Sequence, residues 1–267
     1  MKTASRLYVW LVYIFLYAPI AVLIFFSFNQ AKSRTVFTGF TFDWYRKLMT
    51  NDVIISATMN TLFVAIVASS IAVLLGTSAA IGIMALNRKL RALVINVSYL
   101  PMMNPDIITG VSLMLLFLFL RMELGFTTLI LAHVTFNVPI VIFNVMPKLR
   151  QMDKNVYNAA LDLGCNPTQA FFKVLLPEIM PGITAGFLMS VTYSIDDFVV
   201  SYFTSGSTSQ VLSVVIYSMT RLKVSPEINA LSTIMFVVVL TILLIVNVNG
   251  SKKEKLEVRK IGGGSTL

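Results

Sequence analysis

The sequence predicts an all-α, polytopic membrane protein with about six transmembrane helices. Of its 267 residues, 57% are hydrophobic and 12% are charged, whereas a soluble domain carries about a quarter charged residues. The apolar residues stand in long runs, and a helix needs roughly 20 of them to cross the hydrocarbon core. The basic residues lie in the short segments between these runs, which is typical of a topology signal rather than of a nucleic-acid-binding surface.

Six apolar stretches define the predicted spans. The first follows a short basic N-terminus, is too long for the core of a signal peptide, and lacks a good cleavage site behind it, so we expect a retained anchor. We expect residues 1–250 to form one transmembrane domain and residues 251–267 a cytoplasmic tail. The stretches cover about residues 7–28, 54–86, 93–120, 127–146, 180–204 and 228–249.

The basic residues are divided unequally between the two sides of the membrane. Placing the N-terminus inside puts 14 of the 21 lysines and arginines on the cytoplasmic side. The positive-inside rule therefore predicts that both termini are cytoplasmic. The cytoplasmic set is Lys2, Arg6, Arg88, Lys89, Arg91, Lys148, Arg150, Lys154, Lys173, Lys252, Lys253, Lys255, Arg259 and Lys260.

The first long loop, about residues 29–53, is expected on the outer side. It contains the segment FDWYRKLM, whose mixture of aromatic and charged side chains is typical of a short helix at the membrane interface. Trp44 in this segment favours an interfacial anchor.

The second long loop, about residues 147–179, is expected in the cytoplasm and predicts two short helices. Ala159 favours the first helix, and Gly164 ends it. Asn166 suits the N-cap of the second helix, and Pro167 suits its first position.

Two further prolines, Pro177 and Pro181, are expected to end the second helix before the next span. The loop would then be a compact helical knob that projects into the cytoplasm.

The loop resembles the cytoplasmic loop of ABC importer permeases. That motif reads Glu-Ala-Ala, three residues, Gly, nine residues, Ile, one residue, Leu-Pro, and its spacing is matched here throughout. Asn158 replaces the Glu and Val174 replaces the Ile, so a charge that would contact the ATPase is missing. The resemblance implies that the residues coupling the permease to its ATPase are Asn158, Ala159, Ala160, Asp162, Gly164, Leu176 and Pro177.

Four further segments are similar to the PotC-type permeases of spermidine/putrescine ABC importers. They read MMNPDI, AHVTFNVPIV, SIDDFVVSYF and KVSPEINAL. The resemblance implies a type I importer fold and transport by ATP-driven alternating access in a bacterial inner membrane. It also implies four kinds of partner besides membrane lipid: a second permease subunit (PotB-type), two ATPase subunits (PotA-type) and an extracytoplasmic polyamine-binding protein (PotD-type). No cofactor and no nucleic acid are implied.

Three carboxylates near or within the spans are candidates for contact with a cationic cargo. An ionisable residue inside a span costs about 2.5–3.5 kcal/mol on insertion scales, so it usually faces protein or a water-filled cavity. Pro101 and Pro105 are expected to break a helix, with Asn104 as a cap and Asp106 in the first turn of the next piece, where the helix dipole favours a carboxylate. Local stabilisation and cargo contact are both open for Asp106.

A polar stripe marks the predicted helix over residues 180–204. Its members recur at helical spacing on an otherwise apolar segment, so we expect the stripe to face a partner subunit or the channel. Asp197 lies on the stripe, with a buried helix–helix hydrogen bond as the alternative role, and Asp196 lies about 100° away, where it could pair with a neighbouring span. The stripe is Ser190, Ser194, Asp197, Ser201 and Thr204.

The candidate substrate pathway therefore consists of Asp197, Asp106, Asp196, Ser194 and Ser190. The family resemblance leaves a stacking contact with the cargo open for Trp44, which joins this set.

Catalysis has no support in the sequence. His133 is the only histidine and Cys165 the only cysteine, which leaves no material for a His-based metal cluster or a disulfide. A phosphate-binding loop of the G-x-x-x-x-G-K-S/T kind is missing, so we expect a separate subunit to hydrolyse ATP. Two alternatives stay open: an ABC permease for another solute, and an ion-coupled carrier, which would not need the cytoplasmic knob.

Overall fold

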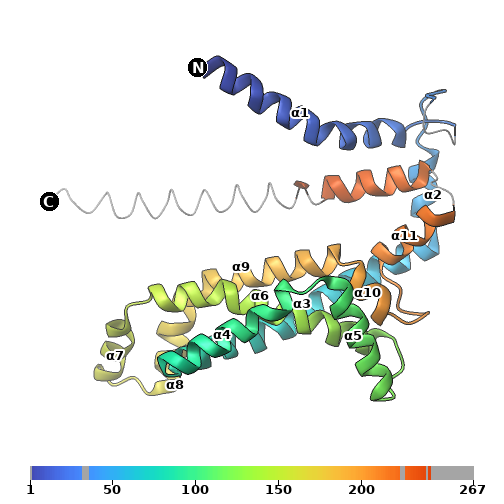
Figure 1. The fold of residues 1–267 in the computed structure, drawn as a ribbon. Coiled ribbons are helices and arrows are strands. Elements are labelled where there is room, and N and C mark those ends of the chain that lie inside the picture. Colours follow the sequence, from blue (N-terminus) through green and yellow to red (C-terminus); the bar gives the residue numbers. More distant parts are fainter. Residues whose placement is uncertain (1, 32–35, 223–225, 239, 242–267) are drawn as a thin grey trace. The chain divides into compact units, whose positions relative to one another are not determined.

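The described chain is built almost entirely from helices (Figure 1). The computed structural model describes residues 2–31, 36–222, 226–238 and 240–241. The chain divides into two units: unit 1 comprises Met1–Ile55 and Ser218–Leu267, and unit 2 comprises Ser56–Tyr217.

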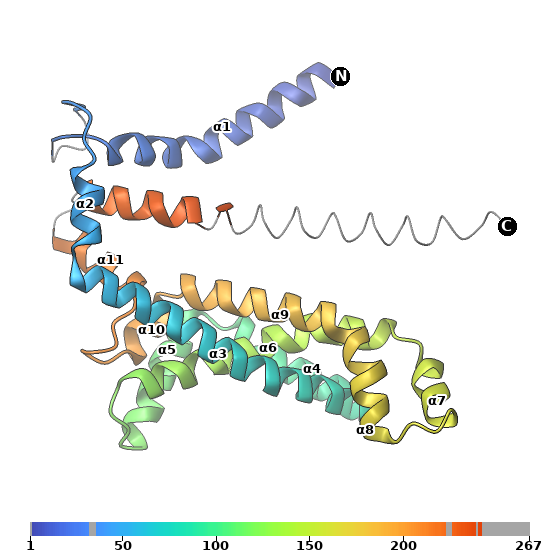
Figure 2. The same cartoon turned by 180° about the vertical axis from the view of Figure 1, so that it is seen from behind.

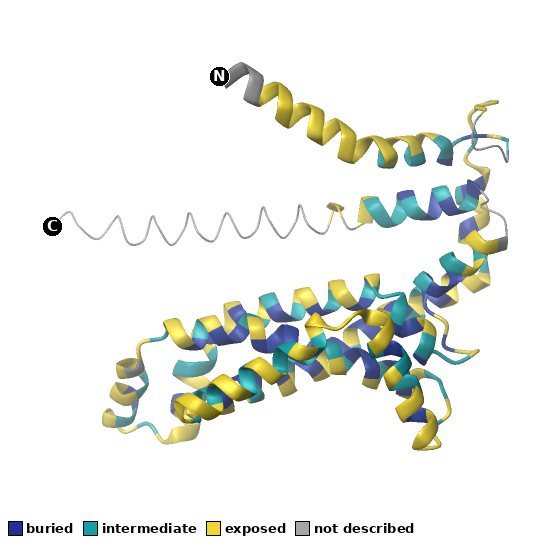
Figure 3. Cartoon of the chain, in the orientation of Figure 1, coloured by how far each residue is buried: buried dark blue, intermediate teal, exposed yellow. Residues whose placement is uncertain are grey.

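Unit 1 contains the two ends of the chain. Helix α1 (Lys2–Ser27) presents apolar side chains on all sides, and most of its described residues are exposed (Figure 3). A helix that is hydrophobic all round needs a lipid or protein environment, which agrees with the predicted first span. The last predicted span begins as the helix Pro226–Val238. Its part after residue 241 and the predicted tail lie outside the described residues.

The segment before helix α2 (Asp43–Met49) is tied to that helix by a few polar contacts. The indole Nε1 of Trp44 donates to the carbonyl oxygen of Asn29 at 2.7 Å. The side chain of Asn29 bonds to the backbone of Val36 and Thr38 at 2.9 Å in each case. The sequence prediction of a short helix here is confirmed.

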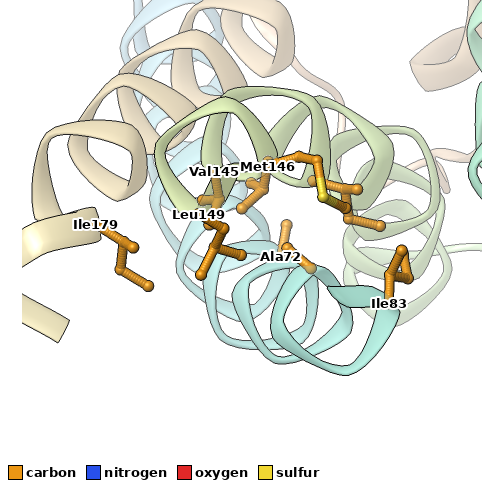
Figure 4. Close-up of a cluster of buried hydrophobic side chains, with 9 residues drawn as sticks. Ala72, Ile83, Val145, Met146, Leu149 and Ile179 are labelled. Atoms are coloured by element: carbon orange, nitrogen blue, oxygen red, sulfur yellow. The ribbon is translucent and has the colours of Figure 1, made fainter. Parts of the chain in front are cut away.

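The core of unit 2 is formed by α3 (Asp52–Ala85), α6 (Phe126–Gln151) and α9 (Leu176–Asp196). Figure 4 shows side chains of all three helices meeting in one buried cluster, which includes Ala72, Val145 and Ile179. Two glycines let the backbones approach. A Cβ on Gly76 would lie 2.7 Å from Val141 Cβ, and one on Gly182 would lie 2.8 Å from the carbonyl oxygen of Asn144.

Four helical segments in the described part of the chain are long and apolar enough to span a membrane: Arg6–Ser27, Asp52–Ala85, Phe126–Gln151 and Pro167–Asp196. A fifth candidate is a bent pair, α4 (Arg88–Met103) and α5 (Asp106–Phe119), whose axes differ by 99°. These segments account for the first five predicted stretches.

The break between α4 and α5 follows from one proline. Asn104 precedes Pro105 and has an extended backbone (φ −73°, ψ 141°), as expected because a proline disfavours the helical conformation of the residue before it. Two details of the prediction are wrong. Pro101 lies inside α4 without ending it, and no side-chain cap hydrogen bond begins α5.

The predicted helix over residues 180–204 is not continuous. Helix α9 ends at Asp196, and a short helix α10 (Val199–Thr204) begins after Asp197 and Phe198. Asp197 is extended (φ −63°, ψ 125°), and its side chain accepts hydrogen bonds from the first turn of α10. Helix α11 (Leu212–Leu222) follows.

The predicted knob contains α7 (Lys154–Asp162) and α8 (Pro167–Ala170). The two lie at one end of unit 2, and α10 lies at the other (Figures 1 and 2). The prediction that Pro177 and Pro181 end the second helix is wrong. A π-helical segment, η1 (Phe171–Leu175), joins α8 to α9 without a break.

The π-helical segment shifts the hydrogen-bond register just before Pro177, since the N–H of Leu176 bonds to the carbonyl of Phe171, five residues back. The register change accommodates a residue that has no N–H of its own to donate.

Candidate transport site and coupling loop

A cavity of about 340 Å³ lies in unit 2 where two helices are interrupted. Its lining comes from the α4–α5 break, the α9–α10 break and the facing side of α6. Interrupted helices at membrane depth are tolerated where they line a cavity. The lining residues are Pro101, Met102, Asp106, Thr109, Phe136, Ile140, Tyr193, Asp196, Asp197, Phe198, Val199 and Val200.

The charged side chains of this lining are three carboxylates, and they are the three that the sequence singled out: Asp106, Asp196 and Asp197. Asp106 opens α5 and Asp196 closes α9. Both are exposed, and neither side chain has a hydrogen bond or ion pair with another described residue. The pairing of Asp196 with a neighbouring span is therefore not found in the described part of the chain. Both carboxylates are available to a ligand.

Asp197 is held by its own chain. Its Oδ2 accepts hydrogen bonds from the backbone N–H and the hydroxyl of Ser201, each at 2.7 Å, and its Oδ1 accepts a longer one of 3.3 Å from the N–H of Val200. The side chain is 11% exposed. Asp197 thus fixes the start of α10 and also contributes to the cavity wall.

The hydroxyl members of the stripe face α6 of the same chain. Ser190, Ser194, Ser201 and Thr204 are all buried, and Asn137 of α6 donates to the Ser194 hydroxyl at 2.8 Å. The expectation that the stripe faces a partner subunit or the channel is therefore wrong for its four hydroxyl residues, which are buried within this chain and are not among the cavity-lining residues. The place of Ser190 and Ser194 in the substrate pathway stays a prediction.

A serine, a histidine and an aspartate meet at this site without forming a hydrolytic triad. In such a triad the aspartate holds the histidine Nδ1 and the histidine activates the serine. Here the serine lies between the other two and donates to the aspartate. The Nδ1 of His133 has no partner among the described residues.

Trp44 belongs to unit 1, where it is buried and donates its indole N–H to a backbone carbonyl. The ammonium of Lys47 lies 4.7 Å from the centre of its ring. These contacts favour an anchoring role for Trp44, and its place in the substrate pathway stays a prediction.

The aromatic side chains of the cavity were not predicted from the sequence. Phe136, Tyr193 and Phe198 join the carboxylates in the wall. A signal existed for Tyr193, which precedes Asp196 and Asp197 by three and four residues and so shares their side of the predicted helix over residues 180–204.

The turn of the coupling loop depends on Gly164. Its φ of +91° lies in the left-handed region, which glycine adopts without a side-chain clash. The N–H groups of Gly164 and Cys165 bond to the carbonyls of Leu161 and Ala160 at 2.9 and 3.0 Å. These two bonds form a Schellman motif that ends α7, as predicted.

The second helix of the loop begins with a capping box. The Asn166 side chain accepts from the N–H of Gln169 at 2.8 Å, and the Gln169 side chain accepts from the N–H of Asn166 at 3.2 Å. The predicted cap at Asn166 and first helical position at Pro167 are confirmed.

The motif residues lie on and around this turn. Asn158, Ala159 and Asp162 are exposed, as is Pro177, whereas Ala160 is buried and Leu176 is half-buried. Leu163, next to the turn, is 86% exposed.

Comparison with models of protein families identifies the family of this chain. Residues 72–249 match the model of the family described as "binding-protein-dependent transport system inner membrane component". The chain belongs to this family.

Two relatives of named function are similar over most of the chain. The spermidine/putrescine transport system permease protein PotC of Escherichia coli (strain K12) is 37% identical over 233 residues, which cover 87% of this chain and 88% of PotC. The putrescine transport system permease protein PotI of the same strain is 37% identical over 257 residues, covering 92% and 90%. This member of the binding-protein-dependent transport family is thus homologous to permease subunits, which are membrane components rather than enzymes.

A solved structure shows the fold. A chain of a bacterial ABC transporter involved in the import of the acidic polysaccharide alginate superposes with a TM-score of 0.75 at 13% identity, covering 92% of this chain and 95% of that one. The predicted all-α permease fold of ABC importers is confirmed.

Proposed function

We propose that this family member is the permease subunit of a bacterial importer for polyamines such as spermidine and putrescine. The main evidence for this substrate class is the lining of the cavity. A polyamine is a chain of ammonium groups joined by methylenes. The three carboxylates suit the ammonium groups, and Phe136, Tyr193 and Phe198 offer faces for both cation–π contact and methylene packing. The similarity to PotC and PotI, which are named as permeases for spermidine/putrescine and putrescine, supports the same substrate class.

Within this proposal the transport cycle is alternating access driven by ATP. Two ATPase subunits (PotA-type) bind the knob of this chain and that of a second permease subunit (PotB-type), and a polyamine-binding protein (PotD-type) delivers the cargo from outside. Because Asn158 offers no negative charge, the apolar Leu163 and the exposed face of α7 are the main docking elements on this chain.

The proposed orientation has both termini and the knob in the cytoplasm. It is supported by the distribution of lysines and arginines along the sequence.

The test removes charge from the two unpaired carboxylates. Asp106→Asn and Asp196→Asn keep side-chain size, so assembly should hold while spermidine uptake falls, by about 10- to 100-fold for each carboxylate if the loss resembles that of an ordinary charged contact of about 1.5–3 kcal/mol. The measurement is uptake of radiolabelled spermidine by cells without other polyamine importers, divided by the amount of complex in the membrane.

Glu123→Gln is the matched control, since Glu123 is exposed in the turn between α5 and α6 and does not line the cavity. Normal uptake by both aspartate variants would refute the assignment of the cavity to a polycation. A fall in the Glu123→Gln protein equal to theirs would show a general effect of surface charge instead.

A further inference from the structure

His133 is the one charged or titratable side chain that α6 buries against α10. Its residue is fully buried, and its ring packs against that of Phe136 with centroids 5.0 Å apart. Phe136 itself lines the cavity, whereas His133 does not. The imidazole therefore lies directly behind the cavity wall, out of reach of a bound cargo.

The imidazole is joined to the cavity through one hydroxyl. His133 Nε2 lies 3.0 Å from Ser201 Oγ, and Ser201 Oγ donates to Asp197 Oδ2 at 2.7 Å. A hydroxyl has a single proton. Since Ser201 gives it to the carboxylate, its oxygen must accept a proton from His133. The hydrogen-bond network thus assigns the proton of the neutral ring to Nε2.

The chain of donors runs in one direction, from His133 to Ser201 to Asp197. Consecutive hydrogen bonds of this kind polarise one another, so each strengthens the next. The alternative, a direct contact, is weaker, because Nε2 and Oδ2 are 3.8 Å apart. Ser201 also donates its backbone N–H to the same carboxylate oxygen at 2.7 Å.

We infer that His133 is a positioning residue for transport: acting through Ser201, it orients the Asp197 carboxylate in the cavity wall. The inference rests on the proposed function, since it takes Asp197 to be part of a site for a cationic cargo. The ring sets the rotation of the Ser201 hydroxyl, and that hydroxyl in turn holds Oδ2. Oδ1, which has only the 3.3 Å contact with Val200, is then the atom left to meet an ammonium group.

Two substitutions of His133 test its role and differ in whether they keep a hydrogen-bond donor. His133→Gln keeps a side-chain N–H at about the position of Nε2, whereas His133→Leu fills similar space without a donor. Leucine also removes the unpartnered Nδ1, so the variant has no new buried polar group and should fold. Ser201→Ala removes the hydroxyl in the middle of the chain.

The measurement is spermidine uptake per ATP hydrolysed by the whole importer in proteoliposomes, with saturating binding protein. In metal sites, the outer hydrogen-bond partners of the ligands contribute about 10- to 100-fold, and we take the lower end of that range for a carboxylate that meets an ammonium group. We expect about a tenfold fall for His133→Leu and for Ser201→Ala, near-normal values for His133→Gln, and no further fall when His133→Leu and Ser201→Ala are combined.

Thr128→Val is the structural control. Thr128 also makes a buried hydrogen bond from α6 to α10, of 2.9 Å to the carbonyl of Thr204, but it has no connection to Asp197. Its loss should leave uptake per ATP unchanged.

Three results would overturn the inference. They are unchanged uptake per ATP in His133→Leu, multiplied losses in the double variant, and an equal fall in Thr128→Val. If Asp106→Asn, Asp196→Asn and His133→Leu all transport normally, both the proposed function and the positioning role of His133 are refuted. If the two aspartate variants are impaired and His133→Leu is normal, only the positioning role is refuted.

Discussion

The turn at Gly164 offers the sharpest test of the knob as a coupling element. A Cβ added at Gly164 would meet no atom within 4 Å, so a substitution strains only the local backbone. At a φ of +91°, a residue with a side chain is disfavoured by about 1–2 kcal/mol. Such a penalty shifts the equilibrium between the formed and unformed turn by about 5- to 30-fold.

Gly164→Ala should therefore loosen the turn, and Gly164→Asp should do so while adding a charge beside the apolar Leu163. We expect both proteins to reach the membrane in normal amounts, with spermidine uptake per ATP reduced in Gly164→Ala and nearly lost in Gly164→Asp. The assay combines co-purification of the ATPase with uptake and ATP hydrolysis in proteoliposomes.

Gly125→Ala is the matched glycine control. Gly125, the N-cap of α6, also has open space around its Cβ position, but its φ of 178° is ordinary extended backbone. It should behave as the unaltered protein. Full coupling in the assembled Gly164→Asp complex would refute the reasoning that links this turn to the ATPase.

Three further predictions concern topology, charge and packing. Cys165, the only thiol, should react with an impermeant maleimide in inside-out vesicles and not in intact spheroplasts; labelling from outside would contradict the proposed orientation. Asp197→Asn can keep the two 2.7 Å bonds to Ser201 and lose only the 3.3 Å bond to Val200, so a failure of spermidine uptake at normal abundance would reflect the missing charge, and normal uptake would remove Asp197 from the site. Gly182→Ala, whose Cβ would lie 2.8 Å from a backbone oxygen of α6, should destabilise the complex by about 1–3 kcal/mol in a thermal melt in detergent, whereas Gly82→Ala, with open space around it, should not.

The parts of the fold that depend on local chemistry could be predicted from the sequence. The long apolar runs of α3 and α6 are visible without any tertiary information, and the turn at Gly164 and the cap at Asn166 follow from the conformational preferences of single residues. The break before Pro105 follows from the lost N–H and the restricted neighbour.

Other features depend on which neighbour a helix meets. The break at Asp197 was not predicted, although aspartate is a residue favoured at helix N-termini and its carboxylate accepts hydrogen bonds from the N–H groups three and four positions further on. Helical spacing showed that Ser190, Ser194 and Ser201 share a face, but it could not show that α6 covers this face.

The carboxylates illustrate the same limit. The sequence identified Asp106, Asp196 and Asp197 one at a time, and only the packing of α5 against α10 brings them to one cavity. Gly110 permits that packing, since a Cβ there would lie 3.0 Å from Phe203 and 3.3 Å from the Cα of Val200.

The uninterrupted helical backbone from Pro167 to Asp196 has a mechanical consequence. It has the form of a crank: α8 is the short arm, and α9, about 30 Å long, is the shaft (Figure 2). A helix resists bending and stretching, so a push on the short arm is taken up either at the π-helical elbow or as rotation and sliding of the shaft. The far end of the shaft is Asp196, and the side chain of the next residue, Asp197, is held by the first turn of α10. One peptide bond joins the two residues, so their Cα atoms stay about 3.8 Å apart. A push on the short arm that rotates the shaft would therefore change the direction of the Asp196 carboxylate relative to the fixed Asp197 carboxylate.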